Sequence, residues 1–295
     1  MPAQRAAARP VLEVGGTHVT AAWVDPAGWQ VHGQRRHPLQ ADASGEQLLV
    51  ELAAAGAELR AGPGAAWGIA MPGPFDYQAG IARYSGVGKF EGLAGHDVRS
   101  ALCRLLPHRP GSISFVNDAS AFLIGEWLIG AAAGARRCAA LTLGTGIGSA
   151  FLDAGRVVDT GPTVPPQAEV HLLRHAGRPL EDWVSRRALR REYARLSPGQ
   201  QPDVRELAEL ARSGDRLALA VFQRAFDVLG QVVGPWLDRF GADHLVIGGA
   251  ISGAWDLIEA PLRNGLAAGS DCRYVIAVAA RPELAPLVGA GYSAS

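Results

Sequence analysis

The chain has few cysteines and almost no lysine, and its charges cancel. Its three cysteines, Cys103, Cys138 and Cys272, are scattered and lack the spacing of metal ligands, which excludes a disulfide framework and is typical of a reducing cytoplasm. Lys89 is the only lysine, and with the abundant alanine and glycine we interpret this as the codon bias of a GC-rich genome. The 28 basic and 28 acidic side chains give no net charge. Electrostatics therefore argue against nucleic acid or an anionic membrane as a partner.

Long apolar runs and a hydrophobic leader are also missing. The best candidate for a membrane span, residues 121–135, is interrupted by Glu126, so no span is predicted. Residues 1–10 carry arginines with no apolar stretch behind them, unlike a secretory signal, and they are too few for a helix-turn-helix domain. At 295 residues with 48% hydrophobic content, the chain is long enough for a large core and two domains.

The predicted strands and helices form two similar halves. The first half has strands at 11–14, 19–24, 29–34, 65–70 and 112–116, and helices over 44–60, 97–106 and 117 to about 134, with Ser44 as an N-cap. The second half has strands at 138–143, 150–152 and 244–247, a capped helix start at Asp203 and Glu206, and a long helix over 215–240, disturbed at Gly234-Pro235. No low-complexity linker separates the halves, so we expect two tightly joined lobes with a cleft between them.

Two glycine-rich turns stand at equivalent places in the halves. Glu13-Val14-Gly15-Gly16-Thr17 ends the first strand, and Gly144-Thr145-Gly146-Ile147-Gly148-Ser149 ends the first strand of the second half. Glycines let backbone N–H groups converge on an anion, because no Cβ blocks the approach, and Glu13 suits a hydrated metal ion. Neither turn is a Walker motif. Together they indicate a nucleotide phosphate tail held from two sides, although a Gly-Gly hairpin turn is by itself more often only a turn.

Three further segments place polar or glycine residues where strands end. Asn117-Asp118 follows a strand, and a plain N-cap needs only one of the two; an Asp there can accept a hydroxyl proton. Glu169-Val170-His171, followed by Glu181-Asp182, is by itself typical of solvated side chains. Gly248-Gly249 after the strand at 244–247 either admits a ribose or a flat ring against the backbone, or serves close packing.

In this order, the segments resemble those of the ROK family of sugar kinases, within the actin-like ATPase superfamily. The glycine turns, the first with Asp25, are similar to its two phosphate motifs, and Asn117-Asp118-Ala119 is similar to its catalytic motif. Met71-Pro72-Gly73-Pro74 resembles the sugar-side turn, Val246-Ile247-Gly248-Gly249-Ala250 the adenosine motif, and residues 286–291 the closing helix. The resemblance covers about residues 11–292. It implies an α/β, actin-like/ribonuclease-H-like two-lobed kinase fold with a cleft, divided into residues 1–118, completed by a C-terminal helix at about 283–295, and residues 119–282.

The resemblance also implies ATP-dependent and Mg²⁺-dependent phosphorylation of a hexose or amino-hexose, usually at the 6-hydroxyl, by a cytoplasmic homodimer. By position, Asp118 would be the general base, and the sugar would contact Gly73, Asn117, Glu169, His171 and Glu181. The phosphates and Mg²⁺ would be held by Glu13, Gly15, Gly16, Thr17, Gly144, Thr145 and Gly146, with the adenosine near Gly248 and Gly249.

Three departures separate the chain from the family pattern. The first motif has Glu13 where the family usually has Asp, and the family's Glu-x-Gly-His is shortened to Glu169-Val170-His171. The cysteine-rich zinc motif is missing, since residues 172–180 contain no thiol, so no zinc site is predicted. Residues 84–90 also differ from the Asn-Leu pattern of glucose-specific members. The sequence leaves open which sugar is the substrate and whether ATP alone or also polyphosphate is the phosphoryl donor. The alternative functions are a kinase of a biosynthetic amino sugar such as kanosamine, and a non-catalytic sugar-binding sensor or regulator.

Overall fold

The protein, seen in a computed structural model that describes residues 8–270 and 274–294, forms two compact units. The first runs to Gly130 and resumes at Arg281, and the second is Ala131–Ala280. The first boundary falls after Gly130 and not after Asp118, because helix α3 (Asp118–Ile129) packs on α9 (Ala285–Ser293) within the first unit. Cys272, residues 1–7 and residue 295 lie outside the described residues.

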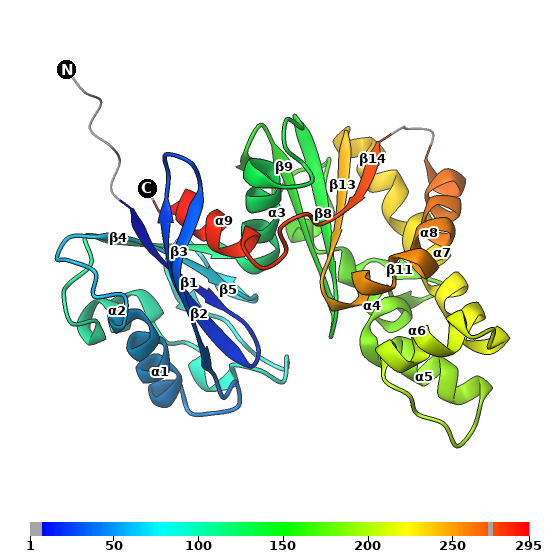
Figure 1. The fold of residues 1–295 in the computed structure, drawn as a ribbon, viewed down its shortest axis with the longest axis horizontal. Helices are drawn as coiled ribbons and strands as arrows, with labels where there is room; N and C mark the ends of the chain where they lie inside the picture. The colour runs from blue at the N-terminus through cyan, green and yellow to red at the C-terminus, as the bar shows by residue number, and fades with distance from the viewer. Residues whose placement is uncertain (1–7, 271–273, 295) are drawn as a thin grey trace. The chain divides into compact units, whose positions relative to one another are not determined.

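The first unit is built on a five-stranded sheet in the order β3-β2-β1-β4-β7 (Figure 1). An antiparallel meander of β1 (Arg9–Val14), β2 (His18–Asp25) and β3 (Gln30–Pro38) is followed by β4 (Ala66–Met71) and β7 (Ser112–Asn117), which run parallel to β1. The carboxyl ends of β1, β4 and β7 therefore meet at one edge, where ligands bind in open α/β sheets.

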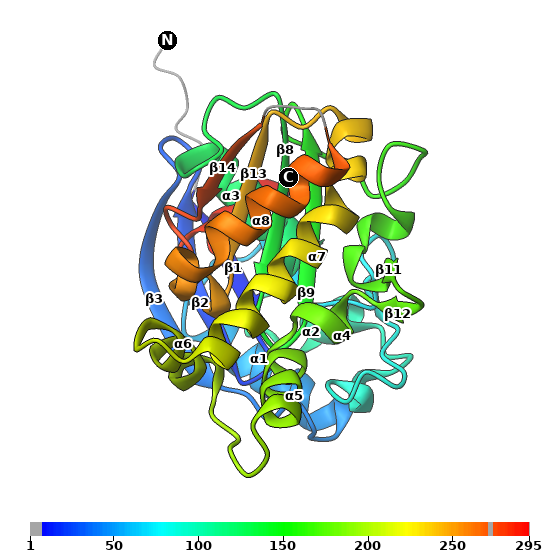
Figure 2. The ribbon, with the colours of Figure 1, turned by 90° about the vertical axis from the view of Figure 1, so that its right-hand side faces the viewer.

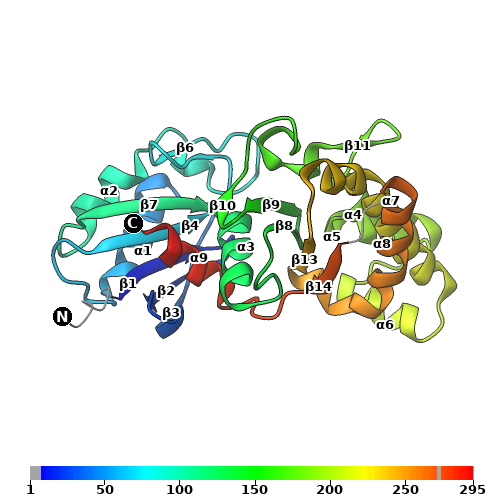
Figure 3. The same cartoon turned by 90° about the horizontal axis from the view of Figure 1, so that it is seen from above.

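Helices cover both faces of this sheet. On one face, α1 (Gly45–Ala57) and α2 (Val98–Leu105) pack over a core that includes Trp67 and Ile69. Gly68, between those two residues, faces α9 on the other face, where an added Cβ would stand 1.9 Å from the carbonyl oxygen of Ala290. Seen from above, α9 lies beside α3 (Figure 3). The predicted N-cap is confirmed, because Ser44 Oγ accepts the N–H of Gln47 at 3.3 Å.

Helix α3 ends at Ile129, earlier than the sequence predicted, and Glu126 near its end is fully buried. One carboxylate oxygen of Glu126 accepts the backbone N–H of Arg281 at 2.7 Å. The other lies 2.1 Å from where a Cβ on Gly130 would stand. Glu126, which interrupts the apolar run, thus lies where the first segment of this unit ends, at Gly130, and where its second segment begins, at Arg281.

The second unit has a sheet in the order β10-β9-β8-β13-β14. Its strands are β8 (Arg137–Leu143), β9 (Ile147–Asp153), β10 (Arg156–Val157), β13 (His244–Gly248) and β14 (Val275–Val278), with β13 parallel to β8 and β14. Helices α7 (Arg216–Phe240) and α8 (Trp255–Gly269) lie side by side across one face (Figure 2). β9 begins at Ile147, so Gly148 and Ser149 belong to the strand and not to the glycine turn as expected.

Helix α7 is the core helix of the second unit. It is capped by Asp215, whose carboxylate accepts the N–H groups of Leu217 and Ala218 at 2.8 and 3.1 Å, and it continues through Pro235, where a disturbance was predicted. Within the described residues it is the one helix long and apolar enough to cross a membrane. Its apolar side chains are instead buried against the sheet and α8, so its length carries no membrane assignment.

Shorter elements complete both units. In the second unit, the predicted capping box of α6 is confirmed, because Asp203 N–H donates to Glu206 at 2.7 Å. The remaining elements are β5 (Phe75–Asp76), β6 (Ile81–Ala82) and η1 (Glu91–Leu93) in the first unit, and η2 (Pro166–Ala168), η3 (Val170–Leu172), β11 (Arg174–His175), β12 (Arg178–Pro179), α4 (Glu181–Val184), α5 (Arg186–Leu196), α6 (Val204–Arg212) and η4 (Ala250–Ala254) in the second.

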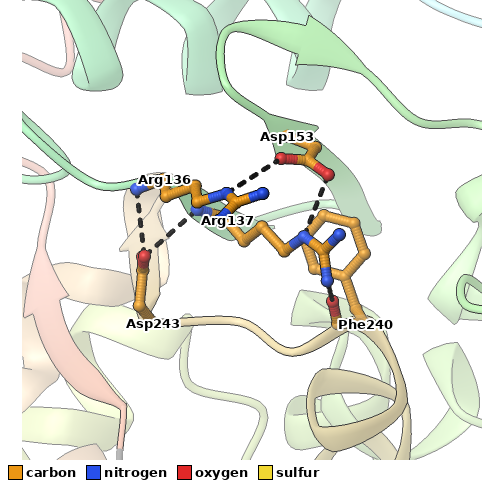
Figure 4. A network of polar contacts seen from close by, with 5 residues as sticks. All are labelled: Arg136, Arg137, Asp153, Phe240 and Asp243. Atoms are coloured by element: carbon orange, nitrogen blue, oxygen red, sulfur yellow. Dashed lines mark hydrogen bonds and ion pairs between the residues drawn. The ribbon is translucent and has the colours of Figure 1, made fainter.

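A polar network fastens the end of the second sheet that lies away from the glycine turn (Figure 4). Asp243 accepts the backbone N–H groups of Arg136 and Arg137 at 2.9 and 3.1 Å. Arg137 in turn donates to Asp153 at 2.9 Å and to the carbonyl of Phe240 at 3.2 Å. These contacts fix the start of β8 against the end of β9 and the end of α7, so the glycine turn stands on an anchored strand.

Candidate functional site

A pocket of about 210 Å³ opens at the carboxyl edge of the first unit's parallel strands. The turn after β1, the turn after β4, the loop between β6 and η1, and the start of α3 all contribute to it. Its lining residues are Val14, Gly15, Gly16, Pro72, Gly73, Tyr84, Val87, Lys89, Phe90 and Asp118. Four of the predicted site residues, Gly15, Gly16, Gly73 and Asp118, therefore lie around one cavity.

Asn117 and Asp118 divide the two roles that the sequence left open. Asn117 is the N-cap of α3, because its Oδ1 accepts the N–H groups of Ala119 and Ser120 at 3.0 and 3.2 Å. Asp118 Oδ1 also accepts from Ala119, at 2.9 Å, while its carboxylate lines the pocket. Asp118 is exposed to solvent at the pocket, while the protein packed behind it partly desolvates the carboxylate and so raises its pKa. A carboxylate of raised pKa is a suitable proton acceptor.

Glu13 is a second carboxylate at this edge. Burial raises its pKa and the charge of Asp118 raises it further, while a hydrogen bond with Thr20, its partner across the β1–β2 ladder, and the charge of Arg36 oppose the rise. His18 Nε2 lies 3.7 Å from Glu13. Burial and Arg36 lower the pKa of His18, so the histidine does not supply a full counter-charge at neutral pH. Glu13 and Asp118 therefore repel each other, and the charge of Arg36 offsets only part of the pKa rise at Glu13.

In the first glycine turn, the side chains packed against Gly15 and Gly16, and not unusual backbone angles, favour glycine. Gly15 N–H donates to the carbonyl of His18 at 2.8 Å, so this donor closes the hairpin and does not point at a ligand. Neither Gly15 nor Gly16 has a positive φ. Added Cβ atoms would instead stand 3.1 Å from the His18 ring and 2.6 Å from Lys89 Nζ. Asp25 lies at the other end of β2, where it accepts the N–H of Ala27 at 2.9 Å, and is not part of this turn.

Two tyrosines hold the turn after β4, Met71-Pro72-Gly73-Pro74, which the sequence predicts to face the sugar. Tyr77 Oη donates to the carbonyl of Met71 at 3.2 Å and accepts from the amide of Asn117 at 2.9 Å. A Cβ on Gly73 would stand 3.4 Å from the same hydroxyl. Tyr84 is fully buried and donates to the carbonyl of Pro72 at 2.7 Å; desolvation raises its pKa strongly, so the hydroxyl stays a donor. Gly73 and Asn117 are thus brought together.

The second glycine turn, Gly144-Thr145-Gly146, belongs to the second unit. Gly144 N–H donates to the carbonyl of Gly146 at 3.0 Å, and the Gly144 carbonyl accepts from Arg186 at 2.9 Å. Glu181 Oε1 lies 2.4 Å from where a Cβ on Gly146 would stand. Glu181, predicted as a sugar contact, therefore lies against this turn, with Thr145 exposed at its tip.

Glu169 and His171 form a half-buried pair in the second unit. The two side chains approach to 4.0 Å and are 35% and 31% exposed, which is less than solvated surface residues would be. Ser149 of β9 holds the segment by donating to the carbonyl of Ala168 and accepting from Val170 N–H at 3.1 Å. The shortened segment therefore still places an acid beside a histidine.

Gly249 has a packing reason to be glycine. Its φ is +83°, and an added Cβ would stand 2.4 Å from the carbonyl oxygen of Leu143. Gly248 pairs with Thr142 in the sheet. Close packing of β13 on β8, one of the two alternatives, is sufficient to explain the second glycine.

The donor set of the first unit fits a divalent cation. Mg²⁺ prefers oxygen ligands, keeps several waters and takes one or two carboxylates together with substrate phosphates. Glu13 and Asp118 are two acids whose charge burial disfavours, and a cation would offset that cost. In the described parts of the chain no group of three or more His, Cys, Asp or Glu is placed to hold a metal ion. The absence of a zinc site stays a prediction.

Sequence reasoning singled out the segment 84–90 but assigned no role to its residues, and it missed Tyr77. Tyr84 and Lys89 line the pocket from the loop after β6, and Tyr77 holds the turn after β4 through its hydroxyl. No motif identified the tyrosines, because their hydroxyls bond to backbone groups that only the fold brings near. Lys89 carried a signal, since it is the single lysine of the chain.

Comparisons with known proteins agree on one family. The model of the ROK family matches residues 10–168. The glucokinase of Thermotoga maritima is 30% identical over 277 residues, which cover 86% of this chain and 85% of that protein.

Solved structures share the fold. The ROK hexokinase of Thermus thermophilus superposes with a TM-score of 0.80 at 26% identity, covering 98% of each chain. A ROK family glucokinase from Streptomyces griseus, in complex with glucose and AMPPNP, superposes with a TM-score of 0.77 at 21% identity, covering 98% of this chain and 99% of that one.

Proposed function

The chain belongs to the ROK family and is a sugar kinase of the actin-like two-lobed α/β fold, and from that premise we propose that it transfers the γ-phosphoryl group of ATP to the 6-hydroxyl of a hexose or amino-hexose. Asp118 is the general base in this proposal. The sugar contacts are assigned to Gly73, Asn117, Glu169, His171 and Glu181, and the phosphate contacts to the two glycine turns.

The observation that carries the proposal is the position of Asp118. Its carboxylate lines the same pocket as the first glycine turn and the sugar-side turn. It stands at the first residue of a capped helix, with one oxygen bonded to Ala119 N–H. A base must be held within reach of the hydroxyl it deprotonates, and the N-cap Asn117 and the end of β7 fix it from both sides.

The proposed reaction is a direct transfer of the phosphoryl group to the sugar hydroxyl, with Asp118 accepting the proton. The sugar hydroxyl gives its proton to Asp118 as its oxygen attacks the γ-phosphorus. The bond from that phosphorus to the β,γ-bridging oxygen breaks, and ADP leaves with the electron pair. Because Asp118 has a raised pKa, it accepts this proton more readily than an aspartate of ordinary pKa does. Mg²⁺, when bound, would neutralise charge on the transferred phosphates, and Glu13 would hold its water shell.

The nucleotide and assembly assignments are extensions of the family resemblance. Gly144, Thr145 and Gly146 are assigned to the ATP phosphates, and Gly248 and Gly249 to the adenosine. AMPPNP in the Streptomyces griseus glucokinase supports ATP as a donor, and the assay with polyphosphate in place of ATP tests the other donor. A homodimer acting in the cytoplasm, without a nucleic-acid or membrane partner, is proposed from the sequence.

Two other functions have an observation in their favour. The acids Glu169, Glu181 and Asp182 tolerate an ammonium group, which favours a biosynthetic amino sugar such as kanosamine as an alternative substrate. Glu13 in place of the family's Asp favours a non-catalytic sugar-binding sensor or regulator. The presence of Asp118 and both glycine turns argues for the kinase.

The proposal is tested by an ADP-release assay with Mg-ATP and a panel of glucose, mannose, N-acetylglucosamine, N-acetylmannosamine, glucosamine and kanosamine. We expect turnover on at least one sugar and a loss of about 10²–10⁴-fold in Asp118→Asn, with sugar binding retained in calorimetry. Near-wild-type turnover in that variant would remove Asp118 from the role. Sugar binding without turnover on any member of the panel would favour the sensor.

A further inference from the structure

We propose that Lys89 is a further catalytic residue, whose ammonium group binds the transferred phosphoryl group at the first glycine turn. This role rests on the proposed kinase function. The side chain lies directly on the turn: a Cβ on Gly16 would stand 2.6 Å from Nζ, 3.2 Å from Cδ and 3.3 Å from Cε. The missing side chain of Gly16 is therefore the space that Lys89 occupies.

The base of Lys89 is held by a buried neighbour. Phe90 is 3% exposed, packs with its ring centroid 5.4 Å from that of Tyr84, and donates its N–H to the carbonyl of Ala41 at 2.6 Å. Tyr84 is itself fixed to Pro72 in the sugar-side turn. Lys89 thus extends into the pocket from a backbone position that the core determines, while its own side chain is exposed.

The ammonium group of Lys89 has no direct polar partner among the described residues. No ion pair or hydrogen bond joins Lys89 to a side chain there, although two carboxylates lie at the same edge. The carboxylate of Asp118 accepts from Ala119 N–H, and His18 Nε2 lies 3.7 Å from Glu13. Lys89 is therefore available to an anion that enters the pocket.

The charge balance of the pocket favours such a group, because Mg²⁺ at the phosphates would offset only part of the negative charge that gathers there. A phosphoryl group brought to Asp118 meets two carboxylates, Glu13 and Asp118, and its equatorial oxygens carry most of the negative charge during transfer. Lysine binds phosphate as a compact point charge. In the proposed step Lys89 keeps its proton and donates hydrogen bonds to these oxygens, while Asp118 takes the proton of the sugar hydroxyl.

Composition makes Lys89 distinct from the other cationic side chains. It is the only lysine among 28 lysines and arginines, so a chain that uses arginine elsewhere has a primary amine at the pocket. Guanidinium is planar and broad, whereas ammonium is small enough to lie over a backbone turn. The single lysine also allows a chemical test, because amine reagents reach only Lys89 and the amino terminus.

The kinetic test compares Lys89→Met with Arg83→Met. Arg83 is an exposed cation six positions away whose partner is Asp76, at 3.4 Å, and it does not line the pocket. We expect Lys89→Met to lower kcat by about 10²-fold, as loss of one preorganised donor to a developing charge does, with the KM for the sugar within about threefold. Arg83→Met should keep kcat within about twofold.

A second measurement does not depend on turnover. Peptide mass spectrometry follows the acetylation rate of Lys89 in the wild-type protein with no ligand, with the sugar, and with Mg-AMPPNP plus the sugar. We expect the nucleotide to slow acetylation about tenfold, and the sugar alone to change it little.

The outcomes separate this inference from the proposed function. Turnover in the wild type with an unchanged kcat in Lys89→Met would overturn the role of Lys89 and leave the kinase intact. A raised sugar KM with kcat unchanged, or protection by the sugar alone, would make Lys89 a sugar contact and overturn the assignment to phosphate. A wild type without turnover whose Lys89 is still protected by nucleotide would contradict the kinase and support the anion site.

Discussion

Glu13 and Asp118 are acids whose charged forms the folded structure disfavours. Burial raises the pKa of each, and the charge of Asp118 adds to the rise at Glu13. An acid with a raised pKa in the folded state binds its proton more tightly there than in the unfolded chain. The free energy of unfolding therefore falls once the pH exceeds the pKa of that acid in the unfolded chain. The site thus lowers stability at neutral pH and has that cost removed in acid.

Asp118→Asn should therefore stabilise the protein while abolishing turnover. We expect Tm at pH 7 to rise by at most about 2 °C, because Asp118 is exposed at the pocket and solvent screens its charge. At a pH below about 3.9, the unfolded pKa of aspartate, the difference from wild type should shrink. Calorimetry at both pH values measures it, and a lower Tm for the variant at pH 7 would contradict desolvation of Asp118.

The same raised pKa should appear in the pH dependence of the reaction. A general base works only when deprotonated, so kcat/KM should fall on the acid side as the pH drops through the pKa of Asp118. Because that pKa is raised, the fall should begin above the ordinary range of aspartate near 3.9. A pH–rate profile of the wild type, with a parallel check that it stays folded, measures this; a midpoint near 3.9 would contradict the expected shift.

At the scale of elements, the sequence predicted what is local and missed what is distant. Ser44 and the Asp203–Glu206 box were identifiable because a cap involves residues three apart. The length of the second glycine turn was wrong, because pairing of Ser149 with Leu141 extends β9. The use of Gly15 N–H inside its hairpin and the arrival of Lys89 at Gly16 depend on tertiary contacts that no spacing encodes.

The packing of α3 against α9 is sensitive to the size of the side chains at their contact. A Cβ on Gly289 would stand 1.9 Å from the carbonyl oxygen of Ala121, and one on Gly125 would stand 2.1 Å from that of Ala285. The two helices therefore meet backbone to backbone at two points. This contact closes one face of the first sheet.

Gly289→Ala should lower the free energy of unfolding by about 1–3 kcal/mol or more, because the helices must separate to admit one methyl group. Gly62→Ala is the matched control, since nothing lies within 4 Å of its added Cβ and its φ is not positive. Urea denaturation of the two variants measures the difference. Equal stabilities would show that α9 shifts freely on α3.

At the scale of the whole molecule, the two units have separate hydrophobic cores. The large apolar cluster of the first unit draws its described residues from positions 12–115, with α3 and α9 packed on the other face of the sheet, and that of the second unit from positions 139–266. Neither core contains a member from the other unit. Stability is therefore a property of each unit, and one unfolding free energy does not describe the chain.

Substitutions in one core should act on one transition. Leu52→Ala and Leu229→Ala each remove a fully buried side chain, from the first and second core respectively, and each should cost about 2–5 kcal/mol. Differential scanning calorimetry should resolve two components, of which each variant lowers a different one. A single transition lowered equally by both would contradict independent cores.

The two-segment build of the first unit also sets an order of events in biosynthesis. Glu126 is made early, but the backbone N–H of Arg281 that it accepts, and α9 behind it, emerge only after the entire second unit has been translated. The second unit is continuous and can finish folding while the first still waits for its last helix, which reverses the usual N-terminal-first order. A chain stopped at Ala280 should accordingly keep the calorimetric transition of the second unit and lose that of the first.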